Sequence, residues 1–251
     1  MTFRIHAEAR TDQGRVRSNN EDSFCDRSAD GLWAVADGMG GHENGEWASA
    51  EVAQAMAQVH LPAQFEDACQ IIASALHRAN ARIWEEASDR GIQMGSTVVV
   101  LYLRERQFAV FWVGDSRAYL LRGGALHRLT RDHTQVQELI DRGLLSETAA
   151  EGHPMAHVLA RAMGVEGSVE VDVITDEACV GDVFLLCSDG LTGPLDEAAI
   201  ADLLASSHHG TAADRLVEQT LARGAPDNLT LVLVALDEAT NLTLPQTGVA
   251  Q

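Results

Sequence analysis

Four aspartates adjoin apolar stretches whose pattern is typical of strands. They are Asp37 (VADGMGG), Asp115 (VGDSR), Asp189 (LLCSDGL) and Asp227 (GAPDNLT). An Asp-Gly pair is common in hairpin turns, and an aspartate before a helix is a common cap. However, neither ADG nor SDG is followed at once by a returning strand. We therefore interpret the four residues as carboxylates that strands hold in fixed positions beside loops.

Carboxylates gathered at one end of a sheet repel one another unless a cation neutralises them. The sequence offers oxygen ligands and no clustered cysteine or histidine, which favours Mg²⁺ or Mn²⁺ over zinc or copper. Two such ions about 3.5–4 Å apart can activate a water and clamp a phosphoryl group. Gly38 fits this scheme, because a residue without a side chain lets its carbonyl oxygen approach a metal closely.

A phosphoryl site also needs cationic hydrogen-bond donors, and all 18 basic residues of this chain are arginines. Arg17 in the block GRVRSNNEDSF is the candidate, with Asp22 five residues later. His42 follows Asp37 by five residues and could give a proton to a leaving alkoxide. A solvated surface would also explain the Arg17 block, and a lone histidine in a loop is more often idle.

Composition excludes several classes of protein. With 37 acidic and 18 basic residues the formal charge is −19, which argues against binding to nucleic acid or to an anionic membrane surface. Without lysine, Schiff-base enzymes, P-loop proteins and protein kinases cannot work in their usual form. The four cysteines lack zinc-site spacing, and there is no apolar stretch of membrane-span length and no signal-peptide pattern. We expect a soluble cytoplasmic protein with reduced thiols.

The hydrophobic periodicity predicts a mixed order of strands and helices within one domain, residues 1–237, followed by a disordered tail, 238–251. Residues 141–169 form the least regular segment, and a loop of that length is usually functional or mobile. Thr211 and Asp214 predict a capping box that opens the last helix. The predicted strands are 31–36, 97–103, 108–113, 118–121, 169–174, 183–187 and 228–234, and the predicted helices are 46–60, 65–83, 134–142, 197–206 and 212–223.

Seven motifs in a fixed order connect this chain to a known family. They are RSNNEDSF, VADGMGGHENGEWAS, GSTVVVLYL, VGDSRAYLLRGGALHRLTRDHTQV, HPMAHVLARAMG, GDVFLLCSDGLT and GAPDNLTLVLV. The set covers about residues 5–236 and resembles the PPM family of metal-dependent serine/threonine phosphatases, also called type 2C, in its short bacterial form. The resemblance implies an α+β fold, a four-layer αββα sandwich of two antiparallel sheets flanked by helices. This agrees with the predicted order of elements.

The resemblance also implies a metal site. Asp37 would bridge two Mn²⁺ or Mg²⁺ ions, and the carbonyl oxygen of Gly38 would bind one of them. Asp189 and Asp227 would complete the ligands of the second ion, while Asp115 would help to hold a third, weaker one.

For the substrate, the resemblance implies that Arg17 binds the phosphate and that Asp22 orients metal-bound waters. His42 would be the general acid. An activated water would attack phosphorus in line, without a phosphoenzyme, and residues 141–169 would form a flap beside the site. The implied partners are phosphorylated proteins and a cognate eukaryotic-like serine/threonine kinase, and we expect the protein to act as a monomer.

Two alternatives stay open. In the first, GDSR is the GDS block of a serine esterase with Ser116 as nucleophile, but no Asp-x-x-His follows and GxSxG is absent. A phosphotransferase with an aspartyl nucleophile would need Asp-x-Asp, and Val35 stands two residues before Asp37. In the second, the chain is a catalytically inactive phosphatase that binds phosphoproteins. Such a protein would normally have lost a metal ligand, whereas all of the implied ligands are present here.

Overall fold

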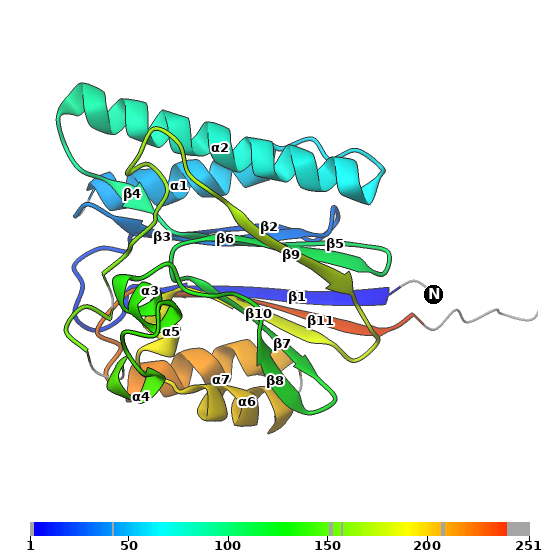
Figure 1. Cartoon of the computed structure of the whole chain (residues 1–251). Helices are drawn as coiled ribbons and strands as arrows, with labels where there is room; N and C mark the ends of the chain where they lie inside the picture. Colours follow the sequence, from blue (N-terminus) through cyan, green and yellow to red (C-terminus); the bar gives the residue numbers. More distant parts are fainter. Residues whose placement is uncertain (1–2, 42, 151–152, 157, 207–208, 240–251) are drawn as a thin grey trace, which may run out of the picture.

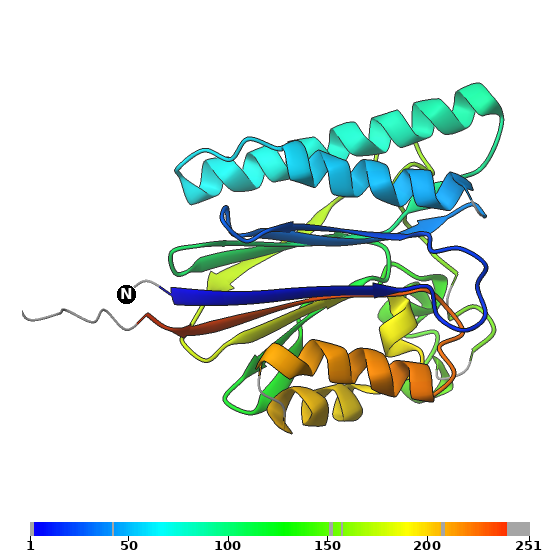
Figure 2. The same ribbon diagram turned by 180° about the vertical axis from the view of Figure 1, so that it is seen from behind.

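The computed structural model describes residues 3–41, 43–150, 153–156, 158–206 and 209–239. Two antiparallel sheets face each other, and a pair of helices covers the outer face of each (Figure 1). The reverse view shows the same four layers (Figure 2). The predicted four-layer αββα sandwich is therefore confirmed.

The first sheet has the strand order β1-β11-β10-β7-β8, and the second has the order β2-β3-β5-β6-β9 with β4 paired to β3. In the first sheet the strands are β1 (Phe3–Asp12), β7 (Arg117–Arg122), β8 (Ala125–Arg128), β10 (Val183–Cys187) and β11 (Leu229–Glu238). In the second they are β2 (Asp22–Arg27), β3 (Leu32–Met39), β4 (Gly95–Ser96), β5 (Val98–Arg104), β6 (Gln107–Val113) and β9 (Asp172–Glu177).

Helices α1 (Glu43–Gln58) and α2 (Phe65–Arg90) cover the second sheet, whereas α6 (Glu197–Ser206) and α7 (His209–Ala222) cover the first (Figure 1). Three short helices, α3 (Gln135–Asp141), α4 (Glu147–Ala150) and α5 (Asp189–Thr192), lie near one end of the sandwich (Figure 1). None of the described helices is both long and apolar enough to cross a membrane.

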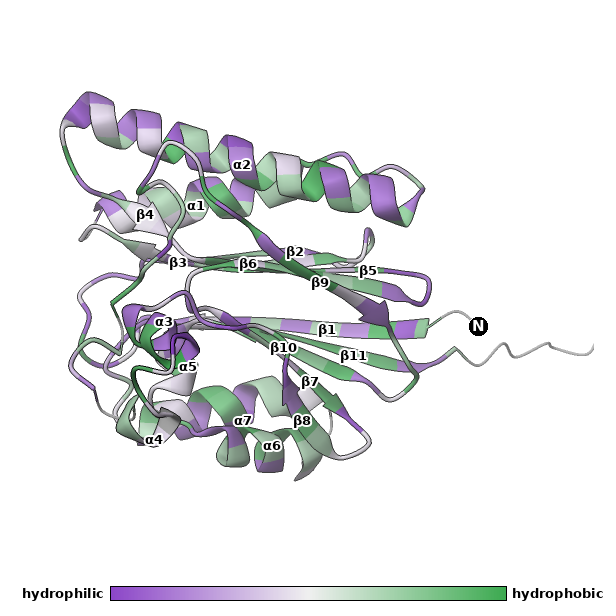
Figure 3. Cartoon of the chain, in the orientation of Figure 1, coloured by the Kyte–Doolittle hydropathy of each residue, from purple (hydrophilic) through white to green (hydrophobic). Residues whose placement is uncertain are grey.

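The central strands β3, β5, β6, β10 and β11 are apolar along most of their length because they are buried on both faces of their sheets. In β5, Val98, Val100 and Tyr102 pack in the core beneath α1 and α2. The residues between them pack in the core between the two sheets. Figure 3 shows the central strands mostly in the hydrophobic colour, whereas the helices alternate between the two colours. The continuous apolar runs of the sequence are thus strands of a four-layer fold.

Two local predictions were wrong. Helix α7 begins at His209, so Thr211 lies inside the helix and the predicted capping box is absent from that place. The first turn is held on the sheet by the buried Ala212 and Ala213, and the carboxylate of Asp214 accepts a hydrogen bond from Arg10 Nε at 2.6 Å. Strand β9 begins three residues later than the strand predicted at 169–174, because the amide of Asn80 binds the backbone of residues 164 and 166 and holds this segment outside the sheet.

Strands β1, β2, β4 and β8 were not predicted. In β1, the side chains that face the other sheet include two alanines, so the strand has little apolar signal. Strand β2 begins inside the charged block GRVRSNNEDSF, for which a solvated surface was the alternative interpretation. At the other end of the chain, Glu238 still belongs to β11, whereas the tail was predicted to begin at residue 238. Residues 240–251 lie outside the described residues, so a disordered tail there stays a prediction.

Candidate active site

Carboxylates from both sheets meet at one end of the sandwich. Asp22 in β2 stands directly opposite Asp37 in β3 in the antiparallel register. Asp115 follows β6, Asp189 follows β10, and Asp227 precedes β11. Of these five carboxylates all except Asp22 line one cavity of about 570 Å³. The structure therefore brings together the four aspartates that the sequence analysis selected.

Burial and mutual repulsion disfavour the charged form of these carboxylates. Burial, followed by the charges of Asp22, Asp189 and the other carboxylates, raises the pKa of Asp37 well above its ordinary value. The pKa of Asp22 rises to about 7, mainly through burial and further through Asp189 and Asp227. Burial also raises the pKa of Asp115 to about 7. The cluster thus has a deficit of positive charge.

Arg17 and Arg161 are the two arginines that line this cavity, and Arg17 pairs with one of its carboxylates. Arg17 Nη2 donates a hydrogen bond to Asp227 Oδ2 at 2.6 Å, and the Arg17 side chain is 54% exposed. The predicted role of Arg17 in binding a substrate phosphate stays a prediction. In this structure its guanidinium group lines the cavity and is bound to one of the carboxylates.

The residues present fit Mg²⁺ or Mn²⁺. Asp22 Oδ2 accepts a hydrogen bond from Ser188 Oγ at 2.7 Å, whereas Oδ1 is buried without a hydrogen-bond partner. A water held by a metal ion would supply that missing donor. Among the described residues, no three acidic, histidine or cysteine side chains are spaced to enclose an ion by themselves. Backbone oxygens and waters would complete each shell, which is common for these cations.

Gly38 lies where backbones are crowded. Its N–H donates to Glu21 O at 3.1 Å, and a Cβ at this position would lie 2.0 Å from Gly45 O. A side chain would therefore push β3 away from the first turn of α1. The structure gives a packing reason for this glycine in addition to the access that its carbonyl group gains.

Hydroxyl groups anchor Asp37 from the neighbouring strands. Its N–H donates to Thr97 Oγ1 at 3.1 Å, and its carbonyl oxygen accepts from Thr97 N at 2.8 Å and from Ser96 Oγ at 3.0 Å. Thr97 Oγ1 also hydrogen-bonds Ser116 Oγ at 2.6 Å. Ser116 is only 1% exposed, so its hydroxyl group is a structural link and not a nucleophile facing a substrate. The sequence analysis missed Thr97, although the motif GSTVVVLYL contains it.

Asn228 fixes the loop that carries Arg17. Its Oδ1 accepts from Glu21 N at 2.9 Å, while Nδ2 donates to Gln13 O at 2.9 Å and to Asn19 O at 2.8 Å. The loop is thereby tied at three backbone positions to a residue more than 200 positions away. The sequence analysis missed Asn228, whose only local signal is its position directly after Asp227.

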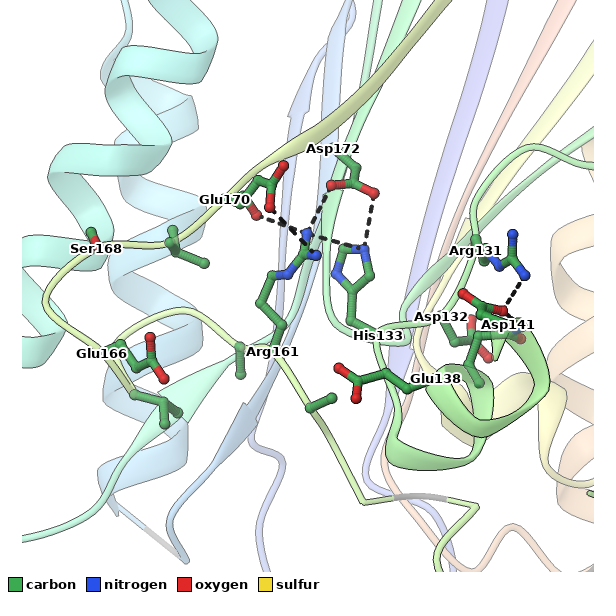
Figure 4. A pocket seen from close by; sticks show the side chains of 15 residues that line it. Arg131, Asp132, His133, Glu138, Asp141, Arg161, Glu166, Ser168, Glu170 and Asp172 are labelled. Carbon is green, nitrogen blue, oxygen red and sulfur yellow. Dashed lines mark hydrogen bonds and ion pairs between the residues drawn. The ribbon is translucent and has the colours of Figure 1, made fainter. Parts of the chain in front are cut away.

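A second pocket, of about 470 Å³, lies beside the cavity and shares Arg161 with it (Figure 4). Arg161 Nη1 and His133 Nε2 both contact the carboxylate of Asp172, at 2.7 and 3.2 Å. Because Gly114 N donates to His133 Nδ1, the imidazole proton is on Nε2 and points to Asp172. Burial, together with Arg161, lowers the pKa of His133 and favours this neutral form.

This arrangement braces the loop of Asp115. His133 holds Gly114, the residue before Asp115, through both its ring and its backbone N–H, which donates to Gly114 O at 2.9 Å. Its carbonyl oxygen accepts from Ala160 N at 2.8 Å. Residues 158–162, which line the cavity, are thus connected to the Asp115 loop. His42 lies outside the described residues, and its position stays a prediction.

The chain is similar to known proteins over nearly its whole length. Residues 7–139 match the family model of protein phosphatase 2C. The serine/threonine phosphatase stp of Listeria innocua is 35% identical over 240 residues, which cover 92% of this chain and 95% of that protein.

Solved structures agree with this similarity. PppA, a key regulatory component of T6SS in Pseudomonas aeruginosa, is 37% identical with a TM-score of 0.85, and the match covers 92% of this chain and 97% of that one. The catalytic domain of the serine/threonine phosphatase PstP in complex with 2 manganese ions is 34% identical with a TM-score of 0.84. That match covers 94% of this chain and all of the other.

Proposed function

This chain belongs to the protein phosphatase 2C family and is a metal-dependent protein serine/threonine phosphatase that uses Mn²⁺ or Mg²⁺, and from this premise we propose how its own residues perform the reaction. The observation that carries the proposal is the cluster of aspartates in which Asp22 and Asp37 face each other, where burial and mutual repulsion raise the pKa of both. Asp37, the carbonyl oxygen of Gly38, Asp189 and Asp227 are the groups that would hold the two ions. When bound, the ions activate a water and neutralise the charge of the phosphate.

Asp115 completes a weaker third site in this proposal. Its support is the raised pKa, which reflects a buried carboxylate close to Asp189 and Asp132, and the bracing of its loop by His133. A rigid loop keeps the carboxylate directed toward the cavity without further ordering cost on binding.

Arg17 binds the substrate phosphate in this proposal. The Arg17 side chain is 54% exposed, and with the charge of Asp227 neutralised by a bound cation it would be free to bind the phosphate oxygens. Asp22 accepts a hydrogen bond from the attacking water or its neighbours through Oδ1, the oxygen without a partner. His42 protonates the leaving serine or threonine alkoxide.

The substrates of a protein phosphatase are phosphorylated proteins. We further propose that this enzyme opposes a eukaryotic-like serine/threonine kinase in bacterial signalling and acts as a monomer in the cytoplasm. All four cysteines are free, which suits a reducing compartment. The formal charge of −19 disfavours nucleic acid and anionic lipid as partners.

The test is hydrolysis of p-nitrophenyl phosphate and of a phosphothreonine peptide by the purified chain, in EDTA and with added Mn²⁺ or Mg²⁺. We expect turnover only with metal, and none in Asp227→Asn. Asp214→Asn, which alters an exposed aspartate on α7, is the matched control and keeps its activity. Turnover in EDTA, or normal turnover by metal-loaded Asp227→Asn, would contradict the mechanism. A folded, metal-bound native chain without turnover would favour the phosphoprotein-binding alternative.

A further inference from the structure

An apolar pocket of about 400 Å³ adjoins the catalytic cavity on the side of α2. It shares Met39, Gly40 and Val165 with that cavity, so the two spaces have a common wall. The other residues that line it are Trp84, Ala87, Ser88, Gly91, Ile92, Gln93, Met94 and Gly164. None of the residues lining it carries a charge, although the chain as a whole has a formal charge of −19.

The common wall is closely packed. A Cβ added at Gly95 would lie 2.7 Å from the Met39 terminal methyl carbon and 3.2 Å from Val165 Cγ2. Both side chains therefore lie close to Gly95. The wall that separates the catalytic cavity from the apolar pocket is formed by the shared residues Met39, Gly40 and Val165.

The far side of the pocket is also fixed in place. Gly164 N donates to Asn80 Oδ1 at 2.7 Å, and Asn80 Nδ2 donates to Glu166 O at 3.0 Å, which ties the loop after Met163 to α2. At Gly167 a Cβ would lie 3.7 Å from the indole ring of Trp84. The pocket thus exists before any ligand binds, which lowers the cost of ordering on binding.

Two of the apolar side chains that line the pocket are exposed to solvent. Trp84 is 41% exposed and Val165 is 55% exposed. Folding does not bury them, and apolar surface of this kind beside a cavity is typical of a ligand site. Continuity with the catalytic cavity identifies the ligand as part of the molecule that is bound there.

We propose that this pocket is a specificity subsite that binds an apolar side chain of the phosphoprotein substrate, close in sequence to the phosphorylated residue. The inference rests on the proposed function of the catalytic cavity. An extended peptide advances about 3.3 Å per residue, so a side chain within a few positions of the phosphoresidue reaches over the wall of Met39 and Val165. Burial of a leucine or phenylalanine side chain raises affinity by roughly tenfold to hundredfold.

The experiment compares phosphothreonine peptides that carry a single leucine or phenylalanine at each of the four positions on either side, in a background of glycine and serine. The native enzyme is loaded with Mn²⁺, and kcat/KM is measured for each peptide and for p-nitrophenyl phosphate as a reference without a peptide. We expect one or two positions at which the apolar residue raises kcat/KM at least about tenfold.

Variants connect that preference to the pocket. Trp84→Ala removes one apolar wall of the pocket. Ser88→Glu places a carboxylate one helical turn from Trp84, on the face of α2 that lines the pocket. Both variants should abolish or sharply reduce the ratio of kcat/KM for apolar peptides to kcat/KM for polar peptides. Ile71→Ala, at a 39% exposed apolar residue elsewhere on α2, is the matched control and should keep the ratio.

A native enzyme without any apolar preference would overturn the proposal, and so would a preference that survives in both pocket variants. In both of these cases the metal-loaded enzyme would still hydrolyse the peptides. Failure of the proposed function would look different, because the native metal-loaded enzyme would then hydrolyse neither the peptides nor p-nitrophenyl phosphate.

Discussion

Two regions of this molecule differ in whether an arginine neutralises their aspartates. Asp182, only 1% exposed, accepts hydrogen bonds from Arg122 Nε at 2.8 Å, from Arg122 Nη2 at 2.7 Å and from Cys179 N at 2.7 Å. Asp22 and Asp37 face each other across two strands, and one oxygen of Asp22 has no hydrogen-bond partner. Where a buried carboxylate serves the fold, the chain supplies an arginine. Where carboxylates are left without one, the cation comes from solution.

The largest effect should follow from a change at the uncompensated cluster. Asp37→Asn removes a carboxylate that we propose holds the ions, and the loss of transition-state stabilisation, about 4 kcal/mol or more, should lower kcat/KM by about 10³-fold or more. Steady-state kinetics at saturating Mn²⁺ measures it, and circular dichroism checks the fold. Asp30→Asn, at an exposed aspartate in a turn, is the control and keeps full activity. Native-like turnover by metal-loaded Asp37→Asn would show that the aspartate cluster does not serve to hold the catalytic ions, and would contradict its contrast with Asp182.

The converse change removes the cation from the compensated site. Arg122→Ala leaves Asp182 buried and unpaired, and we expect a loss of about 2–3 kcal/mol in the free energy of unfolding. This figure is below the range for a fully buried pair because a third of Arg122 is exposed to solvent. Thermal melting should show a drop of about 4–12 °C, while kcat/KM stays at the native value.

The matched control for that variant is Arg90→Ala, which breaks an exposed i,i+4 pair with Glu86. It should change the free energy of unfolding by no more than about 0.5 kcal/mol. If Arg122→Ala changed the free energy of unfolding equally little, the ion pair with Arg122 would not be needed to keep Asp182 buried. The contrast between the two regions would then be contradicted.

A smaller effect concerns pH. In the metal-free protein the folded-state pKa values of Asp22 and Asp115 are raised to about 7 from 3.8, so the folded state holds more protons than the unfolded state between these values. Their contribution to stability is therefore fully present at pH values below 3.8 and is lost as the pH rises through about 7. Bound metal removes this loss by stabilising the charged carboxylates.

Melting temperatures of EDTA-treated and Mn²⁺-saturated protein between pH 5.5 and 8 measure this effect. The difference between the two forms should widen as the pH rises, and Asp22→Asn should reduce the pH dependence of the metal-free form. A difference that stays constant with pH would show that the cluster carries no electrostatic strain.

The sequence predicts the central strands and the carboxylates well, for the same reason. Strands β5, β6 and β10 are buried on both faces and are therefore continuous apolar runs, and the aspartates stand out where such runs end. The roles of Thr97 and Asn228 were not predictable in this way. Each acts through hydrogen bonds to segments far away in the sequence, so no local pattern marks it. Strand β1 was missed because its partner β11 supplies most of the apolar residues of the pair.

The position of β11 has a consequence for the order of events during protein synthesis. This strand is made after every other strand, yet it lies between β1 and β10 in the sheet and pairs with both (Figure 2). Until the ribosome has released it, β1 has no partner in its sheet, and the Arg17 loop lacks the asparagine that fixes it. The growing chain is therefore without phosphatase activity until its last strand is inserted, and the nascent sheet depends on protection from aggregation up to that moment.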